Sequence, residues 1–555
     1  MPSELDRRFD DELARVTGAG GRLVIGRDEL GRPIVTNLPA TLPGFFKAFC
    51  ALNAANEAVV AGDERLTFAD LDRISDRLAH GLVARGIAKS DRVAIAMRNC
   101  PAWIVSYMAI TNAGGIATLL NGWWKAAEME HAIHLTEPKL IISDEARGKH
   151  IAERCSMYDT ACLPIGEPVE RAIAPLLGGT AEGQALPELA PEDHATILFT
   201  SGSTGDAKGA LSTHRAVTTA TYAYASALIV LLGLLTEEGN PPAGPPRTLL
   251  SVPLFHVTGA VPVMLNSFVV GRCMVIMPKW DASEALRLIE KEKITYFVGV
   301  PTMSLELMSH PDRHKYDLSS LKDITAGGAP RPVSHVERLK HEFPGAQPAL
   351  GYGLTETNAV GCSNFWTSYA AKPASTGRAQ KPLVDVTILG AGDRPLPTSE
   401  VGEIGITSAA NIKGYWKNPQ ATQETITADG TVRTGDLGYL DQDGYLFIVD
   451  RKKDIIIRGG ENISAAEVEA ECYACSAVAE AAVFGVPDER LGEIPVAVLY
   501  LKDGEALPEV ELRAFLDPRL AKFKIPERII FSPEALPRLG TGKIDRRALK
   551  AQYSR

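Results

Sequence analysis

Cysteine is scarce in this sequence, with 8 residues in a chain of 555, spread from Cys50 to Cys475. Disulfide frameworks belong mainly to short secreted domains, so this usage predicts a reduced, cytoplasmic compartment. One pair, Cys472 and Cys475, has C-x-x-C spacing, but no second such pair or histidine pair follows to complete a zinc site. Because the pair lies in a predicted helix, residues 464–477, we interpret it as helix packing.

An excess of basic residues is also missing, since 58 lysines and arginines face 68 aspartates and glutamates, a formal net charge of -10. Binding along a phosphate backbone needs a basic face, so we expect no nucleic-acid partner. Residues 1–10 are charged and lack an apolar core, which predicts no signal peptide. Residues 552–555 do not form a peroxisomal signal. These features favour a cytoplasmic location.

Long uncharged runs are rare, and residues 216–235 form the one that needs an explanation. Its length meets the requirement of roughly 20 residues for a membrane span. Its first half, however, is rich in threonine, tyrosine, serine and alanine, and no second clear span accompanies it. We therefore predict a buried helix, with peripheral membrane contact as the alternative. The oligomeric state stays open, with a homodimer among the options.

The length of the chain predicts several domains, because single cores stop growing at roughly 250–300 residues. Strands alternate with helices over residues 67–143 and again over residues 248–324, which predicts two doubly wound, mostly parallel sheets. The first of these helices, from residue 67, has a capping box formed by Thr67 and Asp70. Short strands and tight turns over residues 384–447 predict a small β-rich subdomain.

The predicted fold class is therefore α/β, with a large N-terminal domain and a small C-terminal domain. Residues 1–450 would hold the two sheets and the small β-barrel-like subdomain. Residues 451–555 alternate compact helices and strands and would form a mobile α+β domain. The basic cluster at residues 451–453 marks the hinge candidate between them.

The strongest local signal is a glycine- and hydroxyl-rich loop, residues 200–209, which follows a strand-like run. Glycine lets the backbone approach phosphate oxygens, and hydroxyls and amides donate hydrogen bonds to them. The spacing does not meet the G-x-x-x-x-G-K-[ST] pattern of a Walker A loop. The residues expected to bind phosphate are Thr200, Ser201, Gly202, Ser203, Thr204, Gly205 and Lys208.

Three weaker motifs suit nucleotide chemistry only in combination. Residues 351–357 offer glycines and an aromatic ring to a flat base, and Glu356 is a hard oxygen ligand suited to Mg²⁺. Asp436 precedes a turn and suits hydrogen bonds from ribose hydroxyls. Lys543 follows a glycine-rich loop, where its charge suits a reacting carboxylate or phosphate.

Taken in this order over almost the whole chain, these motifs resemble the acyl-adenylate-forming superfamily of acyl-CoA synthetases, peptide-synthetase adenylation domains and beetle luciferases. The resemblance implies an enzyme that joins a small carboxylic acid to ATP, releases pyrophosphate, and passes the acyl group from acyl-AMP to coenzyme A. It implies ATP, Mg²⁺ and coenzyme A as substrates and cofactors. It also implies a large N-terminal part and a small mobile C-terminal domain.

Residue by residue, the resemblance implies a catalytic set and a binding set. The catalytic residues would be Thr200, His256, Glu356, Arg451 and Lys543, with Glu356 also holding the metal. Besides the phosphate loop, the binding residues would be Gly328, Ala329, Pro330, Gly351, Tyr352, Gly353, Leu354, Thr355, Asp436, Arg451, Lys453, Gly459, Gly460, Glu461 and Lys543. Within these sets, Tyr352 would stack on the base, His256 would flank the acyl pocket and Lys543 would serve adenylation.

The residues around the expected acyl pocket favour an apolar acid. Its expected walls, residues 298–303 and 325–330, are small and apolar, and no aspartate is placed to hold a substrate amine. The stretch after His256 is Thr258-Gly259-Ala260, where some long-chain enzymes of the family carry an aromatic gate. We therefore predict a fatty-acyl-CoA synthetase, with an aryl-acid–CoA ligase or an acyl-AMP ligase that loads a carrier protein as alternatives. The presence of Glu356 and Lys543 disfavours a non-catalytic binding module.

Overall fold

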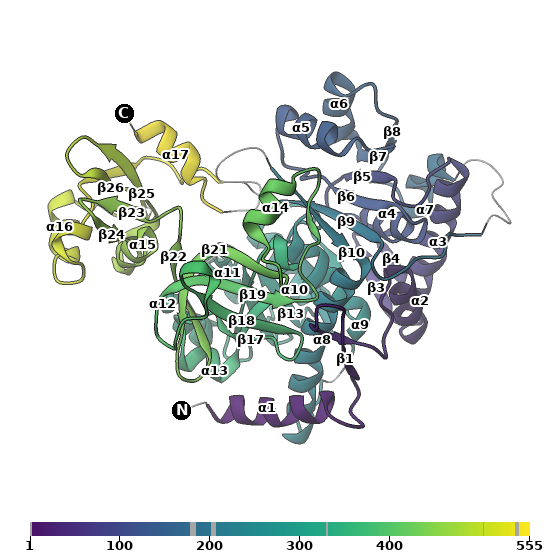
Figure 1. The fold of residues 1–555 in the computed structure, drawn as a ribbon, viewed down its shortest axis with the longest axis horizontal. Helices are drawn as coiled ribbons and strands as arrows, with labels where there is room; N and C mark the ends of the chain where they lie inside the picture. Colours follow the sequence, from purple (N-terminus) through teal and green to yellow (C-terminus); the bar gives the residue numbers. More distant parts are fainter. Residues whose placement is uncertain are drawn as a thin grey trace.

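The computed structural model describes residues 3–177, 185–200, 207–242, 244–328, 331–502, 504–538 and 543–554. Two large sheets form the N-terminal part of the chain, and a smaller sheet stands to one side of them (Figure 1). This arrangement confirms the predicted α/β class with a large N-terminal part and a smaller C-terminal one.

The first sheet has seven strands in the order β20-β10-β9-β6-β5-β7-β8. Its bounds are β5 Arg92–Ala96, β6 Ile116–Leu119, β7 Leu140–Asp144, β8 Thr160–Leu163, β9 His194–Phe199, β10 Gly209–Thr213 and β20 Gly414–Tyr415. The strands from β8 to β9 pair in parallel, whereas β10 pairs with β9 and β20 antiparallel.

The second sheet has thirteen strands, and its parallel centre continues into antiparallel strands at both ends. In spatial order they are β18 Val384–Leu389, β19 Gly402–Ser408, β21 Thr431–Leu440, β22 Tyr445–Arg451, β17 Gly377–Ala379, β16 Gly361–Phe365, β15 Gln347–Gly353, β14 Asp323–Gly327, β13 Tyr296–Gly299, β11 Arg247–Leu250, β12 Cys273–Ile276, β3 Glu57–Ala61 and β4 Glu64–Thr67. The β-rich stretch predicted from residue 384 supplies β18, β19, β21 and β22, which join this sheet through β17.

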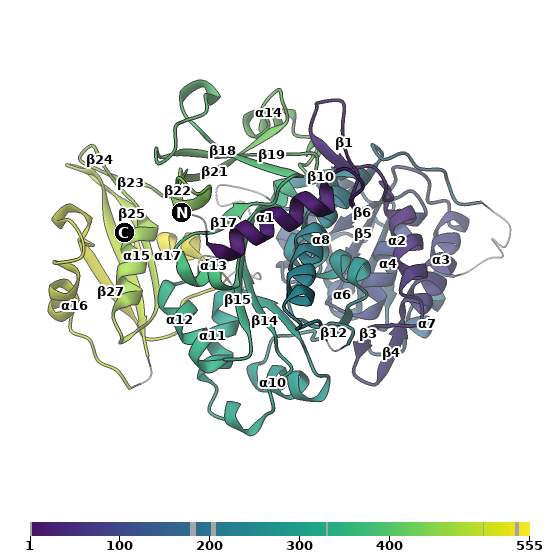
Figure 2. The same cartoon turned by 90° about the horizontal axis from the view of Figure 1, so that it is seen from below.

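Helices cover both sheets and separate them (Figure 2). In chain order they are α1 Glu4–Thr17, α2 Leu42–Leu52, α3 Phe68–Ala84, α4 Pro101–Asn112, α5 Ala126–Thr136, α6 Glu145–Arg154, α7 Val169–Ala172, α8 His214–Glu237, α9 Asn266–Val270, α10 Ala282–Lys291, α11 Pro301–Ser309, α12 Val333–Glu342, α13 Trp366–Ala371 and α14 Pro419–Thr425. A separate two-stranded ribbon joins β1 Ile25–Arg27 to β2 Pro33–Val35.

The C-terminal sheet has five strands, β23 Ile456–Arg458, β24 Glu461–Ile463, β25 Val478–Asp488, β26 Gly492–Leu501 and β27 Arg528–Ser532. Helices α15 Ala465–Ala474, α16 Glu509–Leu516 and α17 Arg546–Tyr553 pack on it. Cys472 and Cys475 are buried, unpaired members of its core, which confirms their interpretation as helix packing.

Helix α8 accounts for the long uncharged run. Among the described residues it is the one helix long and apolar enough to cross a membrane, yet 72% of its most apolar window is buried inside the protein. Tyr222 is buried and its Oη donates to the carbonyl of Pro39 at 2.6 Å. The prediction of a buried helix is confirmed.

Helix α3 begins at the predicted capping box. The Asp70 amide donates to Thr67 Oγ1 at 3.1 Å, and the Thr67 amide donates back to Asp70 Oδ2 at 3.0 Å. The hydrophobic face of the helix, including Leu71, Leu78 and Leu82, is fully buried. The cap thus satisfies two amides that the helix itself cannot pair.

We expect Thr67→Ala to destabilise the protein by about 1 kcal/mol, because it removes the side chain that caps α3. Urea unfolding followed by tryptophan fluorescence measures the change. Thr67→Ser keeps the hydroxyl and is the matched control, expected to unfold close to wild type. Equal destabilisation by both substitutions would show that the hydroxyl does not act as the cap.

Candidate active site

The predicted phosphate loop begins and ends between neighbouring strands of the first sheet. The Thr200 amide donates to the Lys208 carbonyl at 3.0 Å, so the two ends of the loop lie side by side. Ser201, Gly202, Ser203, Thr204 and Gly205 lie outside the described residues. At the end of the loop, Lys208 Nζ lies 5.0 Å from the ring centre of Tyr415.

Tyr415 connects this lysine to the predicted metal ligand. Its Oη donates to Glu356 Oε1 at 2.6 Å, and its pKa is raised by burial and by the nearby Glu356 carboxylate. Tyr415 lies on β20, where it pairs with Ala210 of β10. The structure therefore brings Lys208 and Glu356 to the same place. Sequence reasoning missed Tyr415, whose local signal is only an aromatic pair after Gly414.

Glu356 lies in a short 3₁₀ turn, Thr355–Thr357, directly after β15. Its carbonyl accepts the Ile412 amide at 3.0 Å. Asn358, at a positive φ of 50°, donates from Nδ2 to the Ala410 carbonyl at 2.8 Å. These bonds fix the turn against the segment that leads into β20, so the Glu356 carboxylate is positioned by backbone as well as by Tyr415.

Asp436 lies at the centre of a second cluster. Its Oδ2 accepts Tyr352 Oη at 2.7 Å, and its Oδ1 lies 3.0 Å from Arg451 Nε. Asp436 and Arg451 are register partners of β21 and β22, and Asp436 is only 4% exposed. Burial and the neighbouring Asp436 raise the pKa of Tyr352, which stays a neutral donor. Tyr352, Asp436 and Arg451, which were predicted from separate motifs, therefore lie in contact.

Glycines form an open surface beside Tyr352. Gly351 pairs with Gly327, and a Cβ placed on Gly351 would have no atom within 4 Å. Gly353 has no such room, since a Cβ there would lie 2.0 Å from the Ala359 carbonyl oxygen. Leu354 follows and donates its amide to Thr357 Oγ1 at 3.1 Å. A flat ligand can therefore approach the backbone of β15 at Gly351.

Lys543 reaches this surface from the C-terminal part of the chain. A Cβ on Gly328, which has a φ of 76°, would lie 3.7 Å from Lys543 Cε, whereas Ala329 and Pro330 lie outside the described residues. Loss of hydration lowers the pKa of Lys543 to about 8, and the positive Arg451 contributes. The lysine is thus poised between its charged and neutral forms at mildly alkaline pH.

His256 lies close to the same lysine. Its pKa is lowered to about 3, first by burial and then by the positive charge of Lys543. The ring is therefore neutral at neutral pH, and its Nδ1 accepts the Thr258 amide at 3.3 Å. A neutral, fixed imidazole can orient a neighbouring group but cannot supply a proton as an imidazolium.

The last predicted residues lie in the C-terminal part. The pKa of Lys453, between β22 and β23, is lowered by partial burial and by Arg451. Gly459 and Gly460 make the exposed turn between β23 and β24 with φ values of 60° and 91°, and Glu461 is exposed beside them. In the described parts of the chain, the hydrogen bonds and ion pairs of Asp436 involve none of these three turn residues.

Comparison with protein families agrees with this geometry. The model of the family "AMP-binding enzyme" matches residues 46–416, and that of the "AMP-binding enzyme C-terminal domain" matches residues 467–543. The first match contains the phosphate loop, Glu356 and Tyr415. The second ends at Lys543.

Curated relatives and solved structures extend the likeness over most of the chain. A feruloyl-CoA synthase of an Amycolatopsis species is 35% identical over 487 residues, covering 88% of this chain and 94% of the relative. A long-chain-fatty-acid–CoA ligase of Bacillus subtilis is 33% identical over 519 residues, covering 88% and 90%. The ATP-bound crystal structure of MatB from Rhodopseudomonas palustris superposes with a TM-score of 0.82 at 27% identity, covering 93% and 99%. The chain belongs to the AMP-binding enzyme family and is an AMP-forming acyl-CoA synthetase.

Proposed function

We propose that the acid activated by this ligase is a fatty acid and that the acyl group passes to coenzyme A. The alternatives are an aryl acid as the substrate, or a carrier protein in place of coenzyme A as the acceptor. The observation that carries the proposal is the open surface at Gly351, where no side chain fills the space beside β15. No aromatic gate narrows it at the residues after His256. The residues there are Thr258, Gly259 and Ala260, all with small side chains. Such space suits an extended aliphatic chain.

For adenylation we propose that the loop from Thr200 to Lys208 holds the phosphates of ATP while the acid's carboxylate attacks the α-phosphorus. Tyr352 would stack on the adenine, and Asp436, beside Arg451, would accept the ribose hydroxyls. Lys543 would stabilise the negative charge that develops as pyrophosphate leaves. The contacts of Tyr352 and Arg451 with Asp436 support the assignment of the adenosine end of the site.

The residues around Glu356 fit Mg²⁺. This ion keeps several waters and takes one or two carboxylates together with substrate phosphates. A single carboxylate, held by Tyr415 beside the phosphate-loop lysine, matches that demand. When bound, Mg²⁺ would offset charge on the phosphates. Glu356 then places the ion, and Lys208 remains free to contact the phosphate oxygens directly.

We propose two functional domains, residues 1–450 and 451–555, that rotate about Lys453 between the half-reactions. Lys543 lies beside Gly328 in this conformation, whereas Gly459, Gly460 and Glu461 form an exposed turn. After rotation that turn would face the acyl-adenylate and guide the thiol of coenzyme A. A cytoplasmic location, peripheral membrane contact and a homodimer stay predictions from the sequence.

Purified protein with Mg-ATP and coenzyme A should form acyl-CoA from saturated fatty acids and less from 4-hydroxycinnamate. Mass spectrometry that follows AMP, acyl-AMP and acyl-CoA tests this, with coenzyme A omitted as the control. Faster turnover of the cinnamate would favour the aryl alternative. Acyl-AMP that accumulates with no thioester would favour carrier loading.

Lys543→Ala should slow acyl-AMP formation roughly 100-fold, since it removes one charge from a developing anion. The same variant should convert supplied acyl-AMP and coenzyme A to acyl-CoA at close to the native rate, because the second step uses another surface. Lys550→Ala, an exposed lysine of α17, is the matched control. Native-rate adenylation by Lys543→Ala would refute the role.

The pH dependence of adenylation should report Lys543. Its pKa is lowered from the ordinary value to about 8, so the side chain is charged below that pH and neutral above it. We expect kcat/KM for ATP in the half-reaction to fall as pH rises through about 8, because the positive charge is lost. In Lys543→Arg, which keeps its charge, this fall should disappear. A native profile in the arginine variant would assign the fall to another group.

A further inference from the structure

One row of residues crosses the second sheet from the nucleotide site to α1. Gly327, Gly351, Ser363, Arg378 and Tyr445 are successive register partners on β14, β15, β16, β17 and β22. Directly paired residues project from the same face of a sheet, so this row forms one strip. It begins with two glycines at the adenylate site, continues through a serine and reaches an arginine.

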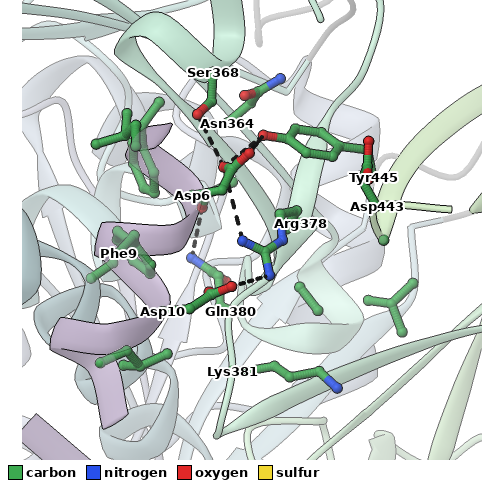
Figure 3. A pocket seen from close by; sticks show the side chains of 18 of the residues that line it. Asp6, Phe9, Asp10, Asn364, Ser368, Arg378, Gln380, Lys381, Asp443 and Tyr445 are labelled. Atoms are coloured by element: carbon green, nitrogen blue, oxygen red, sulfur yellow. Dashed lines mark hydrogen bonds and ion pairs between the residues drawn. The ribbon is translucent and has the colours of Figure 1, made fainter. Parts of the chain in front are cut away.

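Open space accompanies the strip. A Cβ at Gly351 would meet nothing within 4 Å, and one at Gly327 would meet its nearest atom at 3.8 Å. Ser363 and Arg378, further along, line a cavity of about 290 Å³. Ala223 and Ala227 of α8 line one wall, and residues of α1, among them Phe9 and Asp10, line another (Figure 3). Ser363, which lines the cavity and accepts Gln380 Nε2 at 3.0 Å, is the register partner of Gly351, so the cavity begins one strand away from the open surface at Gly351.

The dimensions suit the far end of one substrate. Strands lie roughly 4.8 Å apart, so Arg378, two strands from Gly351, is roughly 10 Å from it. Pockets that hold a complete small ligand usually measure about 300–1,000 Å³. A cavity of about 290 Å³ is at the lower limit, which favours the tail of an acid over a second ligand.

Arg378 is held at the end of the strip by α1. Its Nη2 donates to Asp10 Oδ2 at 2.7 Å, while its Nη1 lies 3.9 Å from Asp6 Oδ1, too far for a hydrogen bond. Asp6 instead accepts Tyr445 Oη at 2.7 Å and Ser368 Oγ at 3.0 Å. Figure 3 shows the guanidinium between the two aspartates. Within the described chain, Nη1 therefore keeps donor capacity for an oxygen in the cavity.

The charges around the cavity decide which oxygen fits. Four carboxylates and two cations line it: Asp6, Asp10, Asp385, Asp443, Arg378 and Lys381. Arg378 pairs with Asp10, Lys381 with Asp385, and Lys372, from outside the lining, with Asp443. These pairs leave the Asp6 carboxylate in excess, so a second carboxylate on the substrate would add to the negative charge there and be repelled. A neutral carbonyl or hydroxyl oxygen accepts from Arg378 without that repulsion. The remaining walls, which include Phe9, Phe365 and Leu440, are apolar.

We propose that the natural substrate is an extended, apolar monocarboxylic acid with a neutral oxygen, a ketone or a hydroxyl, roughly 10 Å from its carboxyl. Arg378 Nη1 donates to that oxygen, and α1 encloses the tail. The proposal rests on the proposed function, because it takes the open surface at Gly351 as the start of the acyl site and sets the acid's carboxyl at that end of the chain. It distinguishes this chain's substrate from a plain fatty acid and from a dicarboxylic acid.

The test compares kcat/KM for 9-oxodecanoate, decanoate and decanedioate, with hexanoate as the short reference acid. The keto acid should exceed decanoate roughly tenfold, as expected for a hydrogen bond to a charged donor, and decanedioate should be the poorest of the three. Arg378→Met should abolish this preference, so that 9-oxodecanoate and decanoate have about equal kcat/KM. Its thermal unfolding midpoint is measured alongside, because Arg378 also holds α1.

A second variant leaves Arg378 and its contacts in place. Ala227→Phe fills the cavity from α8 and should lower kcat/KM for both decanoate and 9-oxodecanoate roughly tenfold relative to hexanoate. Leu232→Phe, at an exposed position of the same helix, is the matched control. It should leave the ratio of ten-carbon to six-carbon turnover as in wild type.

Three results would overturn the proposal while leaving the ligase function intact. These are equal kcat/KM for decanoate and its keto form, a keto-acid preference that survives Arg378→Met, and decanedioate as the best substrate. A ten-carbon to six-carbon ratio unchanged by Ala227→Phe would equally exclude the cavity. Thioester formed from none of the acids, hexanoate included, would overturn the proposed function and this inference with it.

Discussion

The carboxylate of Asp436 joins the parts of the site that the chain delivers separately. It is buried between Tyr352 at the end of β15 and Arg451 at the end of β22. A buried carboxylate is costly unless it is paired and hydrogen-bonded, and here both partners come from predicted nucleotide motifs. The same Arg451 lies immediately before the segment that leads to the C-terminal sheet. One ion pair therefore joins the proposed nucleotide site to the proposed hinge.

Electrostatics around this pair explain why Lys543 is unusual. Its burial near the positive Arg451 lowers its pKa, and its own charge adds to the effect of burial in lowering the pKa of His256. The positive charges of Arg451 and Lys543 repel each other in the neighbourhood of the Asp436 carboxylate. An anionic nucleotide would relieve that repulsion, which gives the C-terminal part of the chain a physical reason to close on bound ATP.

Much of this arrangement could be predicted from the sequence, because it depends on local signals. Thr67 and Asp70 specify a helix start, alternating hydrophobic segments specify the sheets, and the nucleotide motifs, each weak alone, indicate one chemistry when they are taken together. Tyr415 could not be predicted, since it reaches Glu356 only through the pairing of β20 with β10. The docking of α1 was equally hidden, because Asp6 is satisfied by Tyr445, which is distant in sequence. Long-range register creates contacts that no local pattern contains.

The central claim, that Asp436 organises the nucleotide site by binding the ribose, is tested most directly by a double-mutant cycle on nucleotide affinity. Titration calorimetry would compare AMP with 2′,3′-dideoxy-AMP on the wild type and on Asp436→Asn. If Asp436 accepts the ribose hydroxyls, the wild type should bind AMP roughly tenfold more tightly than the dideoxy analogue, and the variant should show little difference. The same tenfold preference in Asp436→Asn would contradict the claim.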